Sequence, residues 1–129
     1  MPTFESRVLI RAPPGDVFAF LSRPENVPLF APGVEDAKLL GGAAGLQGAW
    51  LGLRTRGGHE LRAQITHFHE GSDWTVVDER DTVAQMQVEA APEGTVLTAT
   101  LKGHWRPEQE KRVRQEWEHI IHELPARVE

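Results

Sequence analysis

Turn signals divide most of this chain into short segments at regular intervals. Breaks rich in glycine, or containing aspartate or proline, occur at 41–48, 57–58, 71–73, 80–81 and 92–94. Between them apolar and polar residues alternate, which is the pattern of antiparallel strands joined by short loops. The pattern predicts strands at 3–11, 34–40, 48–56, 59–68, 74–80, 82–90 and 95–105.

The alternation also assigns two faces to these strands. In segment 59–68, Leu61, Ala63 and Ile65 share one side, while charged and amide side chains share the other. The other clearly alternating strands likewise have one apolar and one polar face. This is expected for a single antiparallel sheet that is covered on one side only.

Two helical stretches are available to cover that side. The first runs from Pro13 to Leu21, where a proline suits the first helical turn. The second begins after Pro107 and is expected to end at about Leu124, because Pro125 follows. The helical period predicts its core-facing residues as Val113, Trp117, Ile120, Ile121 and Leu124.

The chain has 129 residues, the size of one ordinary domain, so we expect a single domain over 1–129. After the first helix, Pro24, Pro28 and Pro32 recur at every fourth position. Proline removes a backbone donor and clashes with the preceding turn, so this stretch cannot be one regular helix. It is expected to hold Leu29 and Phe30 rigidly, either at the edge of a cavity or as a plug in the core.

The segment 14–34, which reads PxxVFxFLxxPENVPxFxPGV, resembles the START-like superfamily, also called the SRPBCC or helix-grip fold. The order of predicted elements supports the resemblance over the whole chain. The resemblance implies an α+β fold: a curved antiparallel sheet of six or seven strands wraps around a long C-terminal helix, and two short helices follow the first strand. The family usually has an acidic cap before Pro-Glu-Asn, where this chain has Arg23, and Ser22 is the alternative cap.

The resemblance also implies that ligands lie in a cavity between the sheet and the C-terminal helix. Strand alternation and the helical period select the residues expected around it. These are Phe30 near the entrance, together with Leu51, Leu53, His59, Leu61, Ala63, Ile65, Met86, Val88, Leu101, Trp117 and Ile121.

His59 is the polar member of that set. It points inward if its strand is regular, and it follows Gly57 and Gly58 at the expected cavity mouth. There it would contact a ligand or donate a proton. The alternative is an edge histidine that is partly exposed.

Few residues could support catalysis. The chain has no cysteine or tyrosine, no G-x-S-x-G motif, no P-loop and no dinucleotide fingerprint. The polar residues expected to face inward are Ser6, Thr55, His59 and Gln109. We therefore expect binding or carriage of a small hydrophobic or amphipathic ligand, without a cofactor, rather than an enzyme. The resemblance leaves two alternatives open, a polyketide cyclase or dehydrase and a protein-interaction module without a ligand.

Two histidine pairs have a spacing that could place two imidazoles on one metal ion. His67 and His69 alternate at a strand end, and His119 and His122 are three apart on the last helix. The first pair borders a turn, and the second lies on the polar side of its helix. Both are therefore expected to be solvated, and no metal is predicted.

The net charge of −5 argues against a nucleic-acid partner, because phosphate binding needs a basic surface. No apolar run approaches the ~20 residues of a membrane span, and no signal-peptide pattern begins the chain, so a cytoplasmic location is expected. Trp50 is predicted on the polar face beside Arg54. An exposed Trp–Arg patch of this kind would serve a homodimer or another protein partner.

Overall fold

The computed structural model describes residues 2–42, 47–69 and 71–129, so the predicted turn at 41–48 lies partly outside the described residues. The chain begins with β1 (Thr3–Ile10), α1 (Pro14–Ser22) and the 3-10 helix η1 (Pro24–Leu29). The strands β2 (Val34–Gly41), β3 (Trp50–Thr55), β4 (Glu60–His69), β5 (Asp73–Asp78), β6 (Val83–Ala91) and β7 (Gly94–Lys102) follow. The long helix α2 (Pro107–Val128) ends the fold.

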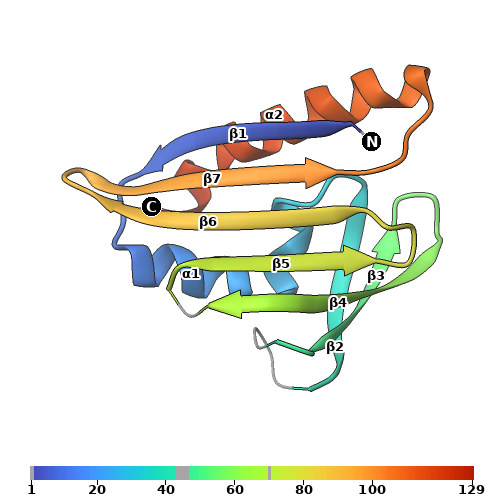
Figure 1. Ribbon diagram of the computed structural model, residues 1–129, viewed down its shortest axis with the longest axis horizontal. Helices are drawn as coiled ribbons and strands as arrows, with labels where there is room; N and C mark the ends of the chain where they lie inside the picture. Colours follow the sequence, from blue (N-terminus) through green and yellow to red (C-terminus); the bar gives the residue numbers. More distant parts are fainter. Residues whose placement is uncertain (1, 43–46, 70) are drawn as a thin grey trace.

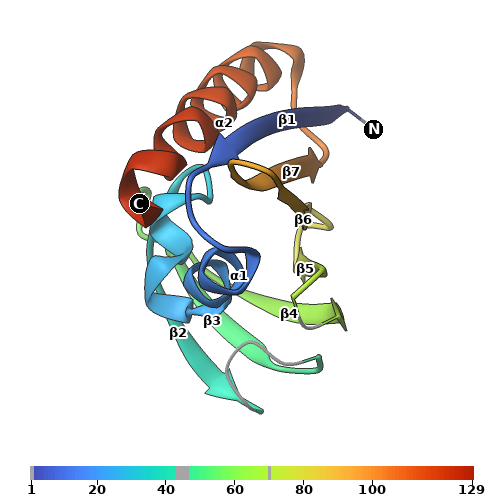
Figure 2. The same cartoon turned by 90° about the vertical axis from the view of Figure 1, so that its left-hand side faces the viewer.

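The seven strands form one antiparallel sheet in the order β1-β7-β6-β5-β4-β3-β2 (Figure 1). Strands β2 to β6 each pair with the next strand in sequence, whereas β1 pairs with β7, with Thr3 opposite Lys102. The sheet is strongly curved, and α1, η1 and α2 all lie on its concave side (Figure 2). This is the predicted α+β helix-grip fold, with seven strands.

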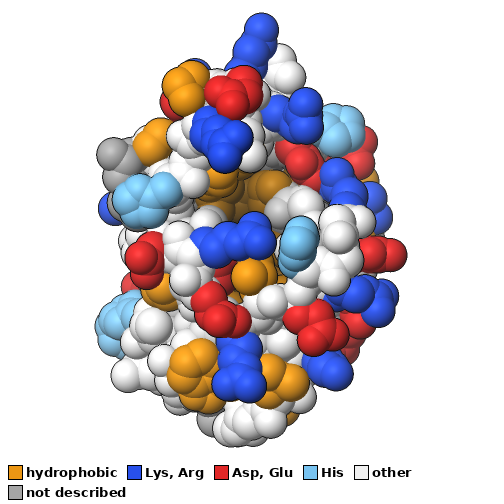
Figure 3. Space-filling view, turned by 90° about the vertical axis from the view of Figure 1, so that its right-hand side faces the viewer, with side chains coloured by type: hydrophobic (Ala, Val, Ile, Leu, Met, Phe, Trp, Pro, Cys, Tyr) orange, Lys and Arg blue, Asp and Glu red, His pale blue; other side chains and the backbone are white. Residues whose placement is uncertain are grey.

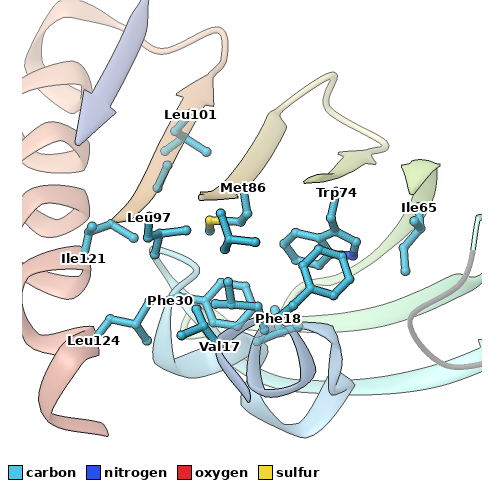
Figure 4. Close-up of a cluster of buried hydrophobic side chains, with 14 of the residues drawn as sticks. Val17, Phe18, Phe30, Ile65, Trp74, Met86, Leu97, Leu101, Ile121 and Leu124 are labelled. Carbon is cyan, nitrogen blue, oxygen red and sulfur yellow. The ribbon is translucent and has the colours of Figure 1, made fainter. Parts of the chain in front are cut away.

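The core lies between the sheet and the three helices. Trp117, Ile121 and Leu124 of α2 are fully buried at 0% exposure, as the helical period predicts. Figure 4 shows Ile121 and Leu124 pointing from α2 toward side chains of the sheet and of α1. Within the described ranges, no helix has the length and apolar character needed to cross a membrane.

Helix α2 continues through Pro125 to Val128, so the predicted end at Leu124 is wrong. Proline removes only one helical hydrogen bond, and later contacts hold the last turn in place. The backbone N–H of Glu129 donates to the Pro125 carbonyl at 2.9 Å, and the Glu129 carboxylate accepts the N–H of Arg11 at 3.1 Å. The end of α2 is therefore fastened to the end of β1.

The proline-rich stretch after α1 forms the 3-10 helix η1, in which Pro28 lies. The expected Ser22 cap is wrong, because the Ser22 hydroxyl donates to the Phe18 carbonyl at 2.7 Å inside α1. Instead, the Asn26 side-chain amide donates to the Phe20 carbonyl at 2.9 Å. This bond joins the two short helices into one unit.

Strand β7 ends at Lys102, three residues before the predicted end at 105. The chain turns at Gly103, where a side chain would approach the Trp105 ring to 2.4 Å. Trp105 is thereby placed on Phe4 of β1, with stacked rings 5.2 Å apart. This turn brings residues 103–105 to one rim of the concave side.

Strand β4 contains a bulge that its alternation does not reveal. Ile65 lies opposite Val76, but His67 lies opposite Thr75, so Thr66 is an extra residue in β4. A bulge reverses the alternation beyond it. Phe68 therefore faces the core, where its ring lies 5.3 Å from that of Phe18, and the flanking residues of β4 face outward.

Candidate functional site

A cavity of about 700 Å³ opens between the concave face of the sheet, the segment after η1 and the first half of α2. Its size lies within the range of about 300–1,000 Å³ that is common for small-molecule sites. Figure 3 shows the mouth on this side of the molecule: hydrophobic side chains line the hollow, and basic, histidine and acidic side chains surround it.

Much of the apolar wall comes from residues that strand alternation selects. Seven of the expected residues line the cavity: Phe30, Leu51, Leu53, Leu61, Ala63, Leu101 and Trp117. Phe30 also packs against Trp74, another wall residue, with ring centroids 5.7 Å apart. The remaining apolar wall residues are Val27, Ala31, Pro32, Val34, Val76, Ala84, Trp105 and Val113.

Four expected wall residues, Ile65, Met86, Val88 and Ile121, are instead buried in the core outside the cavity. At that end of the molecule α1 packs against β6 and β7, and its side chains Val17 and Phe18 point toward the sheet (Figure 4). Alternation identifies which side chains face inward. It does not distinguish a packed core from a cavity wall, because both are apolar.

His59 is exposed and does not line the cavity, which corrects the expectation of an inward ring. The strand begins only at Glu60, so His59 belongs to the turn that joins β3 to β4. Its backbone carbonyl accepts the N–H of Thr55 at 2.9 Å, and its own N–H donates to the Thr55 hydroxyl at 3.2 Å. The imidazole lies back over Gly57.

The polar part of the cavity comes mainly from residues that alternation did not select. Thr55 and Gln109 were expected to face inward, and both line it. Further polar groups come from the β3–β4 turn, the end of β5 and the turn that follows it, the loop before α2 and the first turns of α2. They are Arg56, Asp78, Arg80, Thr82, His104 and Arg112. Most of these residues lie in turns, where no period in the sequence predicts their direction.

Two of the charged wall residues already have hydrogen-bond or ion-pair partners within the protein. The Asp78 carboxylate accepts the backbone N–H groups of Arg80 at 2.7 Å and Thr82 at 3.0 Å. Arg56 forms an ion pair with Glu116, whose carboxylate also accepts the N–H of Gly33 at 3.1 Å. These contacts fix the β5–β6 turn and the segment after η1 around the mouth.

Arg80 and Arg112 are exposed, and neither forms an ion pair within the described ranges. With Arg56, whose charge is already paired with Glu116, they give the lining three arginines and one carboxylate, that of Asp78, although the chain as a whole is acidic. An apolar hollow beneath two available guanidinium groups suits a molecule with an apolar body and an anionic head.

The walls also contain two indole groups whose N–H donors are unused. The Nε1 atoms of Trp74 and Trp117 are buried and have no hydrogen-bond partner among the residues that the structure describes. A buried donor without an acceptor costs about 1–3 kcal/mol. A ligand whose hydrogen-bond acceptor reached these N–H groups would therefore remove this free-energy cost.

Solved structures of similar fold come from several bacteria. A protein of Bacillus halodurans (BH1534) matches with a TM-score of 0.82 and 15% identity over 100% of this chain and 98% of that one. Aha1 of Colwellia psychrerythraea, solved as a dimer, matches with a TM-score of 0.77 and 15% identity over 100% and 97% of the two chains. At these identities the likeness shows the fold alone.

None of the curated proteins with which the chain was compared matches it. A family model described as "Polyketide cyclase / dehydrase and lipid transport" matches residues 1–129. Because this match covers the whole chain and agrees with the helix-grip fold, the chain belongs to the polyketide cyclase/dehydrase and lipid-transport family of START-like proteins.

Proposed function

We propose that this protein binds or carries a small amphipathic molecule. Its apolar body lies in the cavity, and its anionic head lies at the rim beside Arg80 and Arg112. The observation that carries the proposal is that these two exposed guanidinium groups, which form no ion pair with the residues that the structure describes, line an apolar hollow of about 700 Å³. The family description includes lipid transport, which is compatible with this class of ligand.

Two kinds of interaction support the proposed binding mode. Each 100 Å² of apolar ligand surface removed from water contributes roughly 2.5 kcal/mol, before the cost of immobilising the ligand. A carboxylate or phosphate accepts paired hydrogen bonds from a guanidinium group, which orients the head. Because Arg80 and Arg112 are exposed, they contribute more to orientation and selectivity than to affinity.

The lining offers little for the catalytic alternative, a cyclase or dehydrase. Apart from arginines, the titratable residues among the described lining are Asp78 and His104. Asp78 is already held by the backbone of its own turn, and His104 is exposed at the rim. Acid–base catalysis needs a group within hydrogen-bond reach of the reacting proton. Binding needs fewer positioned polar groups than catalysis does, and it therefore fits this lining better.

The test is displacement of an environment-sensitive apolar dye by fatty acids and by fatty alcohols of the same chain length. Ala84→Trp should fill the cavity, because Ala84 lines it and is only half-buried, whereas Ala63 is fully buried and leaves no room for an indole. Ala90→Trp is the matched control, since Ala90 is exposed on the same strand, β6, outside the cavity.

We expect wild type and Ala90→Trp to bind the dye and to prefer the fatty acids, and Ala84→Trp to lose binding while keeping its circular dichroism spectrum. Dye binding by Ala84→Trp at wild-type affinity would place the ligand elsewhere. Equal affinity of wild type for acids and alcohols would refute the role of the rim.

A second candidate function is self-association through an apolar patch on the convex face. Leu40 lies over Gly52 and is 48% exposed, and Trp50 on the neighbouring strand is 43% exposed. The Aha1 structure of similar fold is a dimer. Arg54 contributes less than the sequence suggests, because its guanidinium lies 3.8 Å from Glu35.

Sedimentation equilibrium tests this candidate. We expect wild type to self-associate, and Trp50→Lys to shift the equilibrium to the monomer because it places a charge in the patch. The same mass for both proteins would reject it.

A further inference from the structure

Three side chains that can bind a metal ion meet on the convex face of the sheet, at the hairpin between β4 and β5. The Nε2 atom of His67 lies 2.8 Å from Oδ1 of Asp73, and the Nδ1 atom of His69 lies 3.5 Å from the same oxygen. The three donor atoms all lie within 4.8 Å of one another. None of these residues lines the cavity.

The bulge in β4 builds this arrangement. With uninterrupted alternation, His67 and His69 would share the inward side with Ile65, but the extra residue Thr66 turns both imidazoles outward. The two rings then lie next to each other, with centroids 4.3 Å apart. Both imidazoles are exposed, as the sequence predicts for a solvated pair, but they belong to strand β4, which extends through His69, and not to a turn.

The hairpin supplies the third donor from the neighbouring strand. The chain reverses at Gly71, which has a φ of +75° in the left-handed region, and the N–H of Ser72 donates to the His69 carbonyl at 3.0 Å. This turn sets Asp73 directly opposite His69 in the sheet register. All three donors are therefore positioned by the backbone of one hairpin.

The spacing suits a transition-metal ion. Metal–nitrogen and metal–oxygen bonds of about 2.0–2.2 Å put the donors of a tetrahedral zinc site about 3.3 Å apart. The separations of Asp73 Oδ1 from the two imidazole nitrogens, 2.8 and 3.5 Å, lie on either side of that value. Both imidazoles are exposed and all three donors lie within 4.8 Å of one another, so rotation of the imidazoles can bring the donors to one ion.

Asp73 supplies the anionic donor of the cluster. Its Oδ1 atom is buried, and the imidazole nitrogens of His67 and His69 lie 2.8 and 3.5 Å from it, although neither has the geometry of a hydrogen bond in the described part of the chain. A buried carboxylate is stabilised by a cation at this distance. A metal ion bound between the three donors would neutralise this oxygen.

We propose that His67, His69 and Asp73 form a binding site for a divalent first-row transition metal of the Zn²⁺ type. Two imidazole nitrogens and one carboxylate oxygen favour Zn²⁺, Co²⁺ or Ni²⁺ over Ca²⁺ and Mg²⁺, which prefer all-oxygen sites. Three protein ligands leave a further position for water. The ion would fasten β4 to β5 at the hairpin, independently of any ligand in the cavity.

The second histidine pair provides an internal control. His119 lies 3.2 Å from one carboxylate, that of Glu123, and His122 contacts the carbonyl of Glu118 at 2.6 Å. Among the described residues, no third donor joins these two imidazoles. They match the hairpin histidines in residue type and exposure but not in ligand number.

The experiment is calorimetric titration of the whole, tag-free and metal-free chain with Zn²⁺, together with the visible absorption spectrum of the Co²⁺ form. Wild type should bind one tight equivalent of Zn²⁺, with a rise in Tm, and should show the intense Co²⁺ bands of a low-coordinate site. His69→Ala and Asp73→Asn should each weaken binding at least tenfold, because loss of even an outer-sphere partner typically costs about 10–100-fold. His119→Ala should bind like wild type.

Asp73→Asn preserves the shape of the side chain and its ability to accept a hydrogen bond. It therefore separates a metal ligand from a simple partner of His67. The proposal is overturned if wild type binds Zn²⁺ no more tightly than His69→Ala, or if Asp73→Asn keeps full affinity. The proposal also fails if His119→Ala loses more Zn²⁺ affinity than His69→Ala does. Unchanged circular dichroism of His69→Ala, whose side chain is 65% exposed, shows that the variant is folded.

Discussion

Replacement of Trp117 tests the packing of the cavity wall and the cost of its unused donor together. Trp117→Ala removes a side chain that is fully buried between α2 and the sheet, and substitutions of this kind cost about 3–5 kcal/mol. The same change removes a buried N–H that has no hydrogen-bond partner in the described part of the chain, which returns about 1–3 kcal/mol. The midpoints of the two ranges give a net loss of about 2 kcal/mol. Trp117→Phe keeps most of the ring and loses the donor, so it should be within about 1 kcal/mol of wild type.

Urea unfolding followed by circular dichroism measures both values and is independent of tryptophan fluorescence. Trp50→Ala is the matched control: Trp50 is 43% exposed, and its loss should change stability by no more than about 0.5 kcal/mol. Because the two ranges together allow a net loss of about 0–4 kcal/mol, a Trp117→Ala variant more stable than wild type would mean that the helix buries a different face. If Trp117→Phe is as damaging as Trp117→Ala, the indole N–H has an acceptor in solution and the reasoning fails.

Two further predictions concern the backbone and the rim. Gly94→Ala should cost more than about 3 kcal/mol in urea unfolding, because its Cβ would lie 2.2 Å from the Ile10 carbonyl oxygen at a φ of +144°. Gly15→Ala, with open space around it, should be neutral or stabilising, and equal effects of the two would contradict the close approach. The double change Arg80→Gln and Arg112→Gln should weaken fatty-acid binding roughly 2- to 30-fold and leave fatty-alcohol binding unchanged, as measured by dye displacement. A loss that is the same for acids and alcohols would show that the rim acts through packing and not charge.

Much of the fold can be predicted from the sequence because one face of the sheet is exposed to solvent, so apolar and polar residues alternate along its strands. Leu61 and Ala63 alternate with charged residues, and the period of α2 identifies Trp117 and Leu124 as core. The predicted boundary of an element is wrong where tertiary contacts override the local preference of the sequence. The helix passes through Pro125 because contacts made by the following residues hold its last turn against β1.

The sites are harder to predict, for three different physical reasons. The apolar wall of the cavity has the same alternation as the packed core, so Met86 and Leu101 look alike in sequence and differ in surroundings. The rim residues Arg80 and His104 lie in irregular backbone, whose direction no period fixes. The outward direction of His67 depends on one extra residue in β4, and Thr66 has no sequence mark that distinguishes a bulge from regular strand.

The pairing of β1 with β7 has a consequence for how the chain folds as it is made. Thr3 pairs with Lys102, so 99 more residues must be synthesised after Thr3 before its partner in β7 exists. At about 5–20 residues per second this takes roughly 5–20 s, while each neighbouring pair from β2 to β7 can form locally as it emerges. The fold is therefore completed from its C-terminal half. During synthesis, the exposed alternating edge of β1 is the part of this chain that a nascent-chain chaperone has most reason to cover.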